Sequence, residues 1–297
     1  MGIPAYFSHI IKNYSNILQK FQKQLQVNHL YIDSNSIVYD SIRQIEYNGN
    51  DEIFERKLIN SVCTNIETYI QQISPSHLVY IAFDGVAPVA KLNQQKNRRY
   101  KSWFMADYNT DNSSDNSSDN NTSDKNTKIT SSSSSWNSTA ITPGTEFMNK
   151  LNLQVQYHFR IPTNHNVKQI IVSGSNLPGE GEHKIFEYIR DNEAILKNMK
   201  TVIYGLDADL IMLTINHLHV CKEMYLFRET PDFIRSIDKS LDPNSLYVIH
   251  IPAFKNQLVF YLNNDVEPTT EAESNRIYDY IFLCFMLGND FLPHFPA

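Results

Sequence analysis

The chain has 297 residues, of which 41% are hydrophobic, and a formal net charge of −6 at pH 7. This length and apolar content are enough to bury a real core, in one large α/β domain or two smaller ones. The acidic balance excludes a protein that coats nucleic acid through its bulk charge, so any site for a polyanion must be a local patch.

Cysteine usage and hydropathy indicate in which cellular compartment the protein is expected. The three cysteines, Cys63, Cys221 and Cys284, are odd in number and far apart, which fits reduced thiols in an intracellular protein better than a disulfide framework. No CxxC or HExxH pattern occurs, so a zinc site is not expected. The longest apolar run, residues 280–288, is too short to span a bilayer, and we expect a soluble protein of the cytosol or nucleus.

Short β-rich runs alternate with helical stretches along the chain. The runs predicted to be strands are residues 29–34, 78–85, 169–174, 201–209 and 224–229. Helices are predicted over residues 51–73 and 181–199. Apolar strands separated by helices indicate an α/β fold with a mainly parallel central sheet flanked by helices, in which sites form beyond the carboxyl ends of the strands.

Residues 107–140 interrupt this alternation. They are rich in Ser, Asn, Asp and Thr, and such a segment cannot bury enough apolar surface to offset the entropy lost on ordering. We therefore expect a disordered low-complexity insertion within a single domain that spans residues 1–297.

Acidic residues follow the predicted strands. They are Asp33, Asp84, the pair Glu180 and Glu182, and the pair Asp207 and Asp209, while Asp290 follows the apolar run at 280–288. Taken singly, an Asp after a strand is more often a helix cap or turn residue than a ligand. Each i, i+2 pair, however, points both carboxylates to one side where the backbone is extended, and carboxylates gathered in one crevice repel each other unless cations neutralise them.

This carboxylate pattern favours a particular chemistry. Hard oxygen ligands without Cys or His spacing select Mg²⁺ or Mn²⁺. Two such ions about 4 Å apart can activate a water molecule and stabilise the leaving oxygen in phosphodiester cleavage. We favour a two-metal phosphoesterase site over a set of scattered helix caps.

A basic segment follows Asp84. Lys91, Gln95 and Arg98 fall at i, i+4 and i+7, on one face of a helix, with Arg99 beside them. The usual explanation of such a charge run is a solvated helix, but no acid occurs between Asp84 and Asp107, whereas solvated helices interleave both signs. A face with cations and an amide suits a terminal phosphate.

Eight stretches carry a longer pattern than any single motif: MGIPAYFSHI, LYIDSN, AFDGVAPVAKLNQQKNRRYKS, ITPGTEFM, SGSNLPGEGEHKIFEYIR, YGLDADLIML, LFRE and FLCFMLGNDFLPHFP. Together they resemble the N-terminal conserved region of the 5′→3′ exoribonucleases, closer to the cytoplasmic branch. The resemblance covers nearly the whole chain apart from the low-complexity segment. It implies a PIN- or 5′-nuclease-like fold and a processive enzyme that degrades single-stranded RNA with a 5′ monophosphate.

The same resemblance implies residue roles and cofactors. Two Mg²⁺ or Mn²⁺ ions would be bound by Asp33, Asp84, Glu180, Glu182, Asp207, Asp209 and Asp290. The 5′ phosphate would be bound by Lys91, Gln95, Arg98 and Arg99. Tyr39 stands where the family usually has a His that stacks on a base, and Ser36 replaces a usual Gly. Tyr39 can still stack.

The end of the sequence raises a further expectation. Ala297 lies seven residues after Asp290, whereas the family continues into a second conserved region that encloses the active site. That region, or a decapping protein, is a candidate partner. The stretch LFRETPDF is not followed by a CCHC knuckle, which argues for a cytoplasmic rather than a nuclear location.

Two alternatives from other classes remain open. One is a structure-specific nuclease that cuts 5′ flaps of DNA, since that superfamily also begins MGI and uses a carboxylate cluster. The other is a truncated, non-catalytic RNA-binding module. A haloacid-dehalogenase-type phosphatase is less well supported, because its nucleophile motif requires DxD and the sequence has Asp33-Ser34-Asn35.

Overall fold

The protein is described here by a computed structural model of residues 3, 6–14, 16–114, 136–228, 241–242 and 245–288. Seven strands form one sheet in the order β1-β7-β6-β5-β2-β3-β4. Their bounds are β1 (Leu18–Lys20), β2 (His29–Asp33), β3 (Leu78–Ala82), β4 (Gln169–Ser173), β5 (Lys200–Tyr204), β6 (Glu223–Phe227) and β7 (Tyr247–His250).

The sheet is mainly parallel, as the sequence predicts. Strands β4, β3, β2, β5 and β6 are mutually parallel. Strand β7 pairs antiparallel with β6 on one side and with β1 on the other. The predicted α/β class is therefore confirmed, and the five mutually parallel strands end at the same edge of the sheet.

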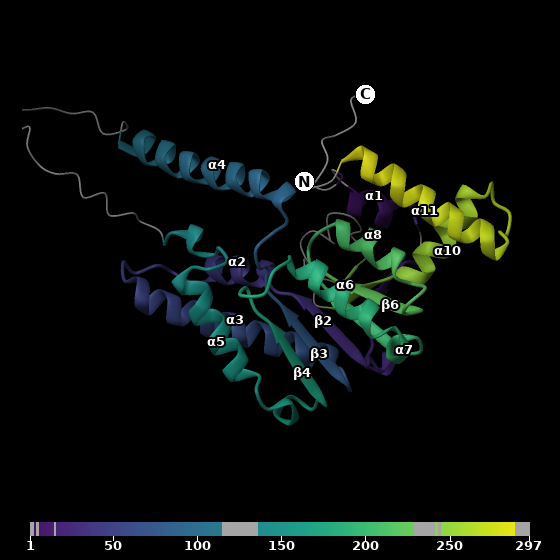
Figure 1. Cartoon of the computed structure of the whole chain (residues 1–297), viewed down its shortest axis with the longest axis horizontal. Helices are drawn as coiled ribbons and strands as arrows, with labels where there is room; N and C mark the ends of the chain where they lie inside the picture. The colour runs from purple at the N-terminus through teal and green to yellow at the C-terminus, as the bar shows by residue number, and fades with distance from the viewer. Residues whose placement is uncertain are drawn as a thin grey trace, which may run out of the picture.

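Helices cover both faces of the sheet (Figure 1). Their bounds are α1 (Tyr6–Asn13), α2 (Asn35–Gln44), α3 (Asp51–Ile73), α4 (Val89–Ser114), α5 (Glu146–His158), α6 (Gly181–Asp191), α7 (Glu193–Leu196), α8 (Asp209–Asn216), α10 (Ile251–Leu262) and α11 (Thr270–Leu287). Helices α2, α3 and α5 contribute to one apolar cluster. Helices α1, α6, α8, α10 and α11 contribute to a second.

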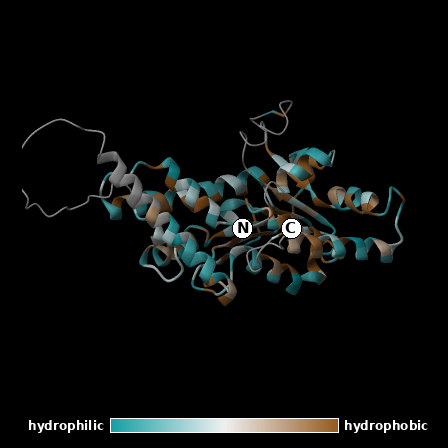
Figure 2. Cartoon of the chain, turned by 90° about the horizontal axis from the view of Figure 1, so that it is seen from above, coloured by the Kyte–Doolittle hydropathy of each residue, from teal (hydrophilic) through white to brown (hydrophobic). Residues whose placement is uncertain are grey.

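Strand residues divide between these two clusters in alternation. Leu30 and Ile32 of β2 face the α3 side, whereas Tyr31 between them faces the α6 side. Both sheet faces are thus apolar, which is why the parallel strands read as continuous apolar runs rather than alternating ones. Figure 2 shows hydrophobic residues gathered along the strands and polar residues on the outer helix surfaces.

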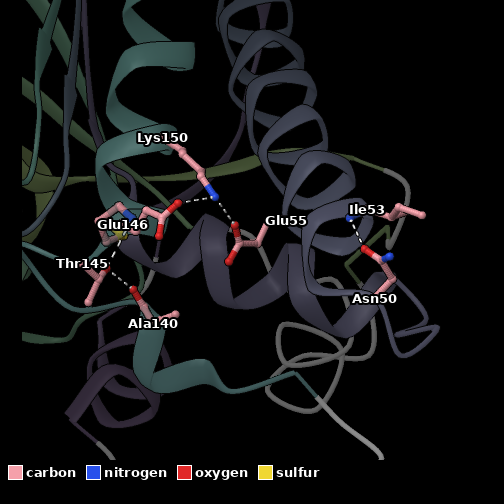
Figure 3. A network of polar contacts seen from close by, with 8 residues as sticks. Asn50, Ile53, Glu55, Ala140, Thr145, Glu146 and Lys150 are labelled. Carbon is pink, nitrogen blue, oxygen red and sulfur yellow. Dashed lines mark hydrogen bonds and ion pairs between the residues drawn. The ribbon is translucent and has the colours of Figure 1, made fainter.

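Polar contacts fix the helices on the α3 side (Figure 3). The Nζ of Lys150 on α5 lies 3.1 Å from the Glu55 carboxylate of α3 and 2.9 Å from that of Glu146. Asn50 and Thr145 cap the N-termini of α3 and α5 by accepting the backbone N–H groups of Ile53 and Met148. These contacts set the starts of both helices and tie α5 to α3.

The boundaries of the predicted disordered insertion need correction at both ends. Helix α4 continues to Ser114, and Ser138–Ala140 forms a 3₁₀ turn. Trp136 is buried, 8% exposed, with its ring 5.4 Å from that of Phe54 and 5.0 Å from that of Phe147. A large ring buried between two others outweighs the polar composition around it. Residues 115–135 lie outside the described part.

Two expectations about the setting can be compared with the structure. All three cysteines are buried free thiols, in keeping with the absence of a disulfide framework. Among the described residues, no helix combines the length and the apolar character needed to cross a membrane.

Candidate active site

The predicted carboxylates meet at the carboxyl edge of the parallel sheet. Six of them line one cavity of about 690 Å³: Asp33, Asp84, Glu180, Glu182, Asp207 and Asp209. Asp33 is the last residue of β2, and the others follow β3, β4 and β5. Parallel strands deliver their carboxyl ends to the same place. The seventh predicted acid, Asp290, lies outside the described residues.

Asp33 lies at the centre of this group. Burial raises its pKa well above the usual range, and the neighbouring charges of Asp84, Glu182 and Asp207 raise it further. Its Oδ1 atom is buried and has no hydrogen-bond partner among the described residues. A bare buried carboxylate oxygen is unfavourable unless a proton or a cation occupies it. Binding of a cation or a proton at this site would therefore stabilise the buried carboxylates.

Asp84 is held by two neighbours. Its Oδ1 accepts the backbone N–H of Gly181 at 2.7 Å, and its Oδ2 accepts Nδ2 of Asn35 at 2.5 Å. Burial raises the pKa of Asp84, although the Gly181 hydrogen bond opposes that rise. A Cβ atom at Gly181 would lie 2.5 Å from Oδ1 of Asp33, so only glycine lets the start of α6 approach these carboxylates so closely.

Glu182 and Asp209 show the same electrostatic conflict. Burial raises the pKa of Glu182 to about 8; Lys91 opposes the rise, whereas Asp207 adds to it. Burial also raises the pKa of Asp209, with Asp207 adding to the effect. Oδ1 of Asp209 is another buried oxygen without a hydrogen-bond partner in the described part of the chain. Like-charged groups this close favour binding of multivalent cations.

His183 was missed by the sequence reasoning. Glu180, Glu182 and His183 each offer one ligand atom, and these atoms lie within 4.8 Å of one another. The histidine directly follows the EGE pattern, which was the available signal. The donor set is dominated by oxygen, and together with the bare oxygens of Asp33 and Asp209 it fits a hard divalent cation.

The basic segment reaches the same cavity. Lys91, Gln95 and Arg99 of α4 line it together with the carboxylates. Nζ of Lys91 lies 2.8 Å from Oε1 and 2.8 Å from Oε2 of Glu180. The side chain of Arg98 lies outside the described part of the structure. The grouping of cations and acids in one cavity agrees with the predicted phosphate pocket, whose function stays a prediction.

The connection from β3 to α4 is pinned to the loop that carries Glu180. The N–H of Gly85 donates to Gly179 O at 2.8 Å, and the N–H of Gly179 donates to Val86 O at 3.0 Å. A Cβ atom at Gly85 would lie 1.7 Å from the carbonyl oxygen of Leu177. The close approach of these two backbones sets the position of α4 relative to the carboxylates.

Lys184 fastens the same region of the chain. Its buried Nζ donates to Phe83 O and to Gly174 O, each at 2.8 Å. These carbonyls lie just beyond β3 and β4. Burial lowers the pKa of Lys184 to about 8, and Asp84 opposes that shift. The Lys184 ammonium thus joins the ends of β3 and β4.

Another wall of the cavity comes from α2 and β6. Tyr39, 45% exposed, lines it with Ser36 and Arg43 of the same helix, a position from which a ring can stack on a base. Arg228 lines it just beyond β6, with its guanidinium 4.5 Å from the Phe7 ring centroid. Arg228 lies in the LFRE stretch of the family resemblance, but the sequence alone assigns no role to its side chain.

Sequence comparison identifies the family to which the chain belongs. Residues 1–230 match the family described as "XRN 5′-3′ exonuclease N-terminus". The chain belongs to this family, which confirms the resemblance noted in its motifs. A second family, described as "Xrn1 helical domain", matches residues 271–297, a range that includes most of α11.

Particular relatives carry the name 5′-3′ exoribonuclease 1. That of Saccharomyces cerevisiae is 33% identical and that of Homo sapiens 30% identical, each over 100% of this chain. The chain covers 19% and 18% of those relatives, respectively, so it spans about a fifth of their length. The 5′-3′ exoribonuclease 2 of Arabidopsis thaliana is 28% identical, and the chain covers 35% of it.

Among solved structures, the catalytic core of Rad2 in complex with DNA substrate aligns with 99% of this chain and 64% of its own chain. The TM-score is 0.49 and the sequence identity is 10%.

Proposed function

We propose that this chain carries the nuclease site of a 5′→3′ exoribonuclease that removes mononucleotides from single-stranded RNA with a 5′ monophosphate. One observation supports this most directly: a single cavity is lined both by the six carboxylates and by Lys91, Gln95 and Arg99. Cleavage and end recognition can therefore act on one strand at once. Family membership supports RNA as the substrate.

The carboxylates would bind two Mg²⁺ or Mn²⁺ ions. Bound ions of this kind supply a hydroxide nucleophile at neutral pH and stabilise the charge on the leaving oxygen. The chain supplies the geometry: Gly181 and Asn35 fix Asp84, and Lys184 joins the ends of β3 and β4. Asp33 and Asp209 each contribute a buried oxygen that has no hydrogen-bond partner among the described residues and that a bound cation would neutralise. Asp290 completes the proposed ligand set.

The proposed phosphate pocket lies on the first turns of α4. A planar guanidinium such as that of Arg99 can bind two phosphate oxygens at once, and Gln95 adds an amide donor. Arg98 is assigned to the same pocket by its helical spacing. A pocket for a monophosphate discriminates against capped and triphosphorylated ends through steric clash and unpaired charge. The ring of Tyr39 would stack on a base of the bound strand.

Two further expectations belong to this proposal. We propose a cytoplasmic location, in line with the branch that the motifs resemble. We also propose that a second conserved region, or a decapping protein, acts together with this nuclease region on cellular RNA.

The test uses two RNAs of one sequence that differ only in a 5′ monophosphate or a 5′ hydroxyl, incubated with the purified chain and Mg²⁺. Release of mononucleotides from the monophosphate RNA alone is expected. Asp207→Asn should abolish release, whereas Asp191→Asn, an exposed acid at the end of α6, should not. Cleavage of a DNA flap with the RNA left intact would support the flap nuclease instead. RNA that binds but stays intact would support a non-catalytic module.

A further inference from the structure

Lys91 forms an ion pair with Glu180, one of the carboxylates proposed to bind a metal ion. Its ammonium nitrogen lies 2.8 Å from both oxygens of Glu180, and the two side chains are only 9% and 6% exposed. A buried pair this close is strongly attractive, because little water remains to screen it. In this arrangement the ammonium neutralises Glu180 directly.

A divalent cation at Glu180 would require those same oxygens. An ammonium and a metal ion placed together on one buried carboxylate repel each other, since the low dielectric strengthens like-charge repulsion as much as attraction. Metal binding would therefore weaken the contact between Lys91 and Glu180. The four-carbon stem of lysine can swing its charge to a new partner without movement of the helix.

A new partner lies within the same cavity. Gln95 stands one helical turn beyond Lys91 on α4, and Arg99 one further turn along. Side chains one turn apart on a helix are neighbours. A phosphate held by Gln95 and Arg99 would thus lie within reach of a displaced Lys91 ammonium.

We propose that Lys91 alternates between Glu180 and the substrate 5′ phosphate, so that occupation of the metal site makes the phosphate pocket competent. This inference rests on the proposed function. It makes Lys91 a residue that couples two binding events, beyond a fixed phosphate ligand. Coupling of this kind is reciprocal: the metal raises phosphate affinity by the same factor by which phosphate raises metal affinity.

The test measures binding rather than turnover. Adenosine 5′-monophosphate has a 5′ phosphate and no phosphodiester bond to cut, and adenosine lacks the phosphate. Calorimetric titrations of the whole chain would give the dissociation constants of Mn²⁺ alone, of each nucleoside without metal, and of each with saturating Mn²⁺. In the wild type, Mn²⁺ should tighten binding of the monophosphate, but not of adenosine, by roughly 5- to 150-fold.

Lys91→Met separates this proposal from direct contact between phosphate and metal. Removal of the competing ammonium should make Mn²⁺ bind more tightly in the absence of nucleotide, while the coupling to the monophosphate falls toward one. Lys91→Gln, which can still hydrogen-bond to Glu180, provides a second variant should Lys91→Met be poorly folded. Lys96→Met, which removes an exposed cation of α4, controls for net charge and should leave Mn²⁺ binding and the coupling unchanged.

Unchanged or weaker Mn²⁺ binding in both Lys91 variants would overturn the proposal. So would coupling of wild-type size in those variants. A wild type that binds the monophosphate no better than adenosine would instead count against 5′-phosphate recognition, and hence against the proposed function. The Mn²⁺ affinities of the variants would still report whether Lys91 competes at Glu180.

Discussion

The side-chain amide of Asn35 contacts Asp84 twice. Its Nδ2 donates to Oδ2 of Asp84 at 2.5 Å, and its Oδ1 accepts the backbone N–H of Asp84 at 3.1 Å. The first residue of α2 therefore sets the orientation of an acid that follows β3. If Asp84 is a metal ligand as proposed, these two contacts would position it before a cation binds, which would lower the cost of assembling the site.

Replacement of Asn35 tests this positioning. We expect Asn35→Ala to lower kcat on 5′-monophosphate RNA by about 10- to 100-fold, because a ligand that loses its supporting hydrogen bonds typically loses that much activity or metal affinity. Steady-state kinetics at saturating Mg²⁺ would measure it. Asn65→Ala, which removes a hydrogen bond to Ser41 away from the cavity, serves as the matched control. Equal activity of the two variants would contradict the positioning role.

Gly181 offers a test in which stability and function separate. A Cβ there would lie 2.5 Å from Oδ1 of Asp33, so Gly181→Ala should displace this proposed metal ligand. Alanine is also a better helix former than glycine, so the start of α6 should not be weakened. We expect calorimetry to show at least a tenfold loss of Mn²⁺ affinity, about 1.4 kcal/mol, with little change in Tm. If the Gly181→Ala variant bound Mn²⁺ as tightly as the wild type, the backbone at residue 181 would have to shift enough to remove the clash with Asp33, which would contradict the prediction.

The metal-free protein should lose stability as pH rises. The pKa of Glu182 is near 4.5 in a model compound and about 8 in the folded chain. Between these values the folded state binds more protons than the unfolded state, so the free energy of unfolding falls as pH increases. The raised pKa of Asp33 acts in the same direction. Burial lowers the pKa of four histidines, His29, His183, His217 and His250, and these groups add stability as pH rises only up to about 6.5. With a chelator present, we therefore expect a lower Tm at about pH 8 than at about pH 6.5.

Saturating Mg²⁺ should reverse this trend, because the cation binds deprotonated carboxylates and only in the folded state. Thermal melts across the pH range, with and without Mg²⁺, would show it. Glu182→Gln should flatten the metal-free slope. A Tm that rises between about pH 6.5 and about pH 8 in the chelator would contradict the electrostatic account of the site.

Trp136 should matter for stability despite its position beside a polar segment. We expect Trp136→Ala to lower the free energy of unfolding by about 3–5 kcal/mol, the range for removal of a large buried ring. Denaturant titration would measure this. Tyr157→Ala, at a residue 63% exposed, should cost less than about 1 kcal/mol. Similar losses for both variants would place Trp136 outside the core.

The sequence predicts much of the framework because its signals are local. Residues 51–73 form α3 with the predicted bounds, since the helix has an Asn cap and a regular apolar face. Each predicted strand is present, and the acids after the strands converge because parallel strands end together. These features depend on patterns within a few residues and on one topological rule.

Other features depend on contacts that a linear pattern does not contain. Strands β1 and β7 were missed, because segments of three and four residues carry too little alternation to be separated from loops. The contact of Lys91 with Glu180 joins residues 89 positions apart, and its existence follows from the fold rather than from spacing. Trp136 was assigned to a disordered segment because the composition of its neighbours dominated the prediction.

The pinned connection at Gly85 has a consequence for the size of the product. Lys91 follows Asp84 by seven positions, and the intervening backbone is clamped to the loop of Gly179. If α4 binds the 5′ phosphate of the RNA and the RNA is cleaved at the site that contains Asp84, this connection fixes the distance between phosphate binding and cleavage at one nucleotide. This distance is not set by residues 85 and 86 alone, because their backbone is hydrogen-bonded to the loop that carries Glu180. A shift of residues 85 and 86 would therefore also shift Glu180. The number of nucleotides removed in each cleavage would thus depend on these backbone contacts rather than on a side chain that contacts RNA.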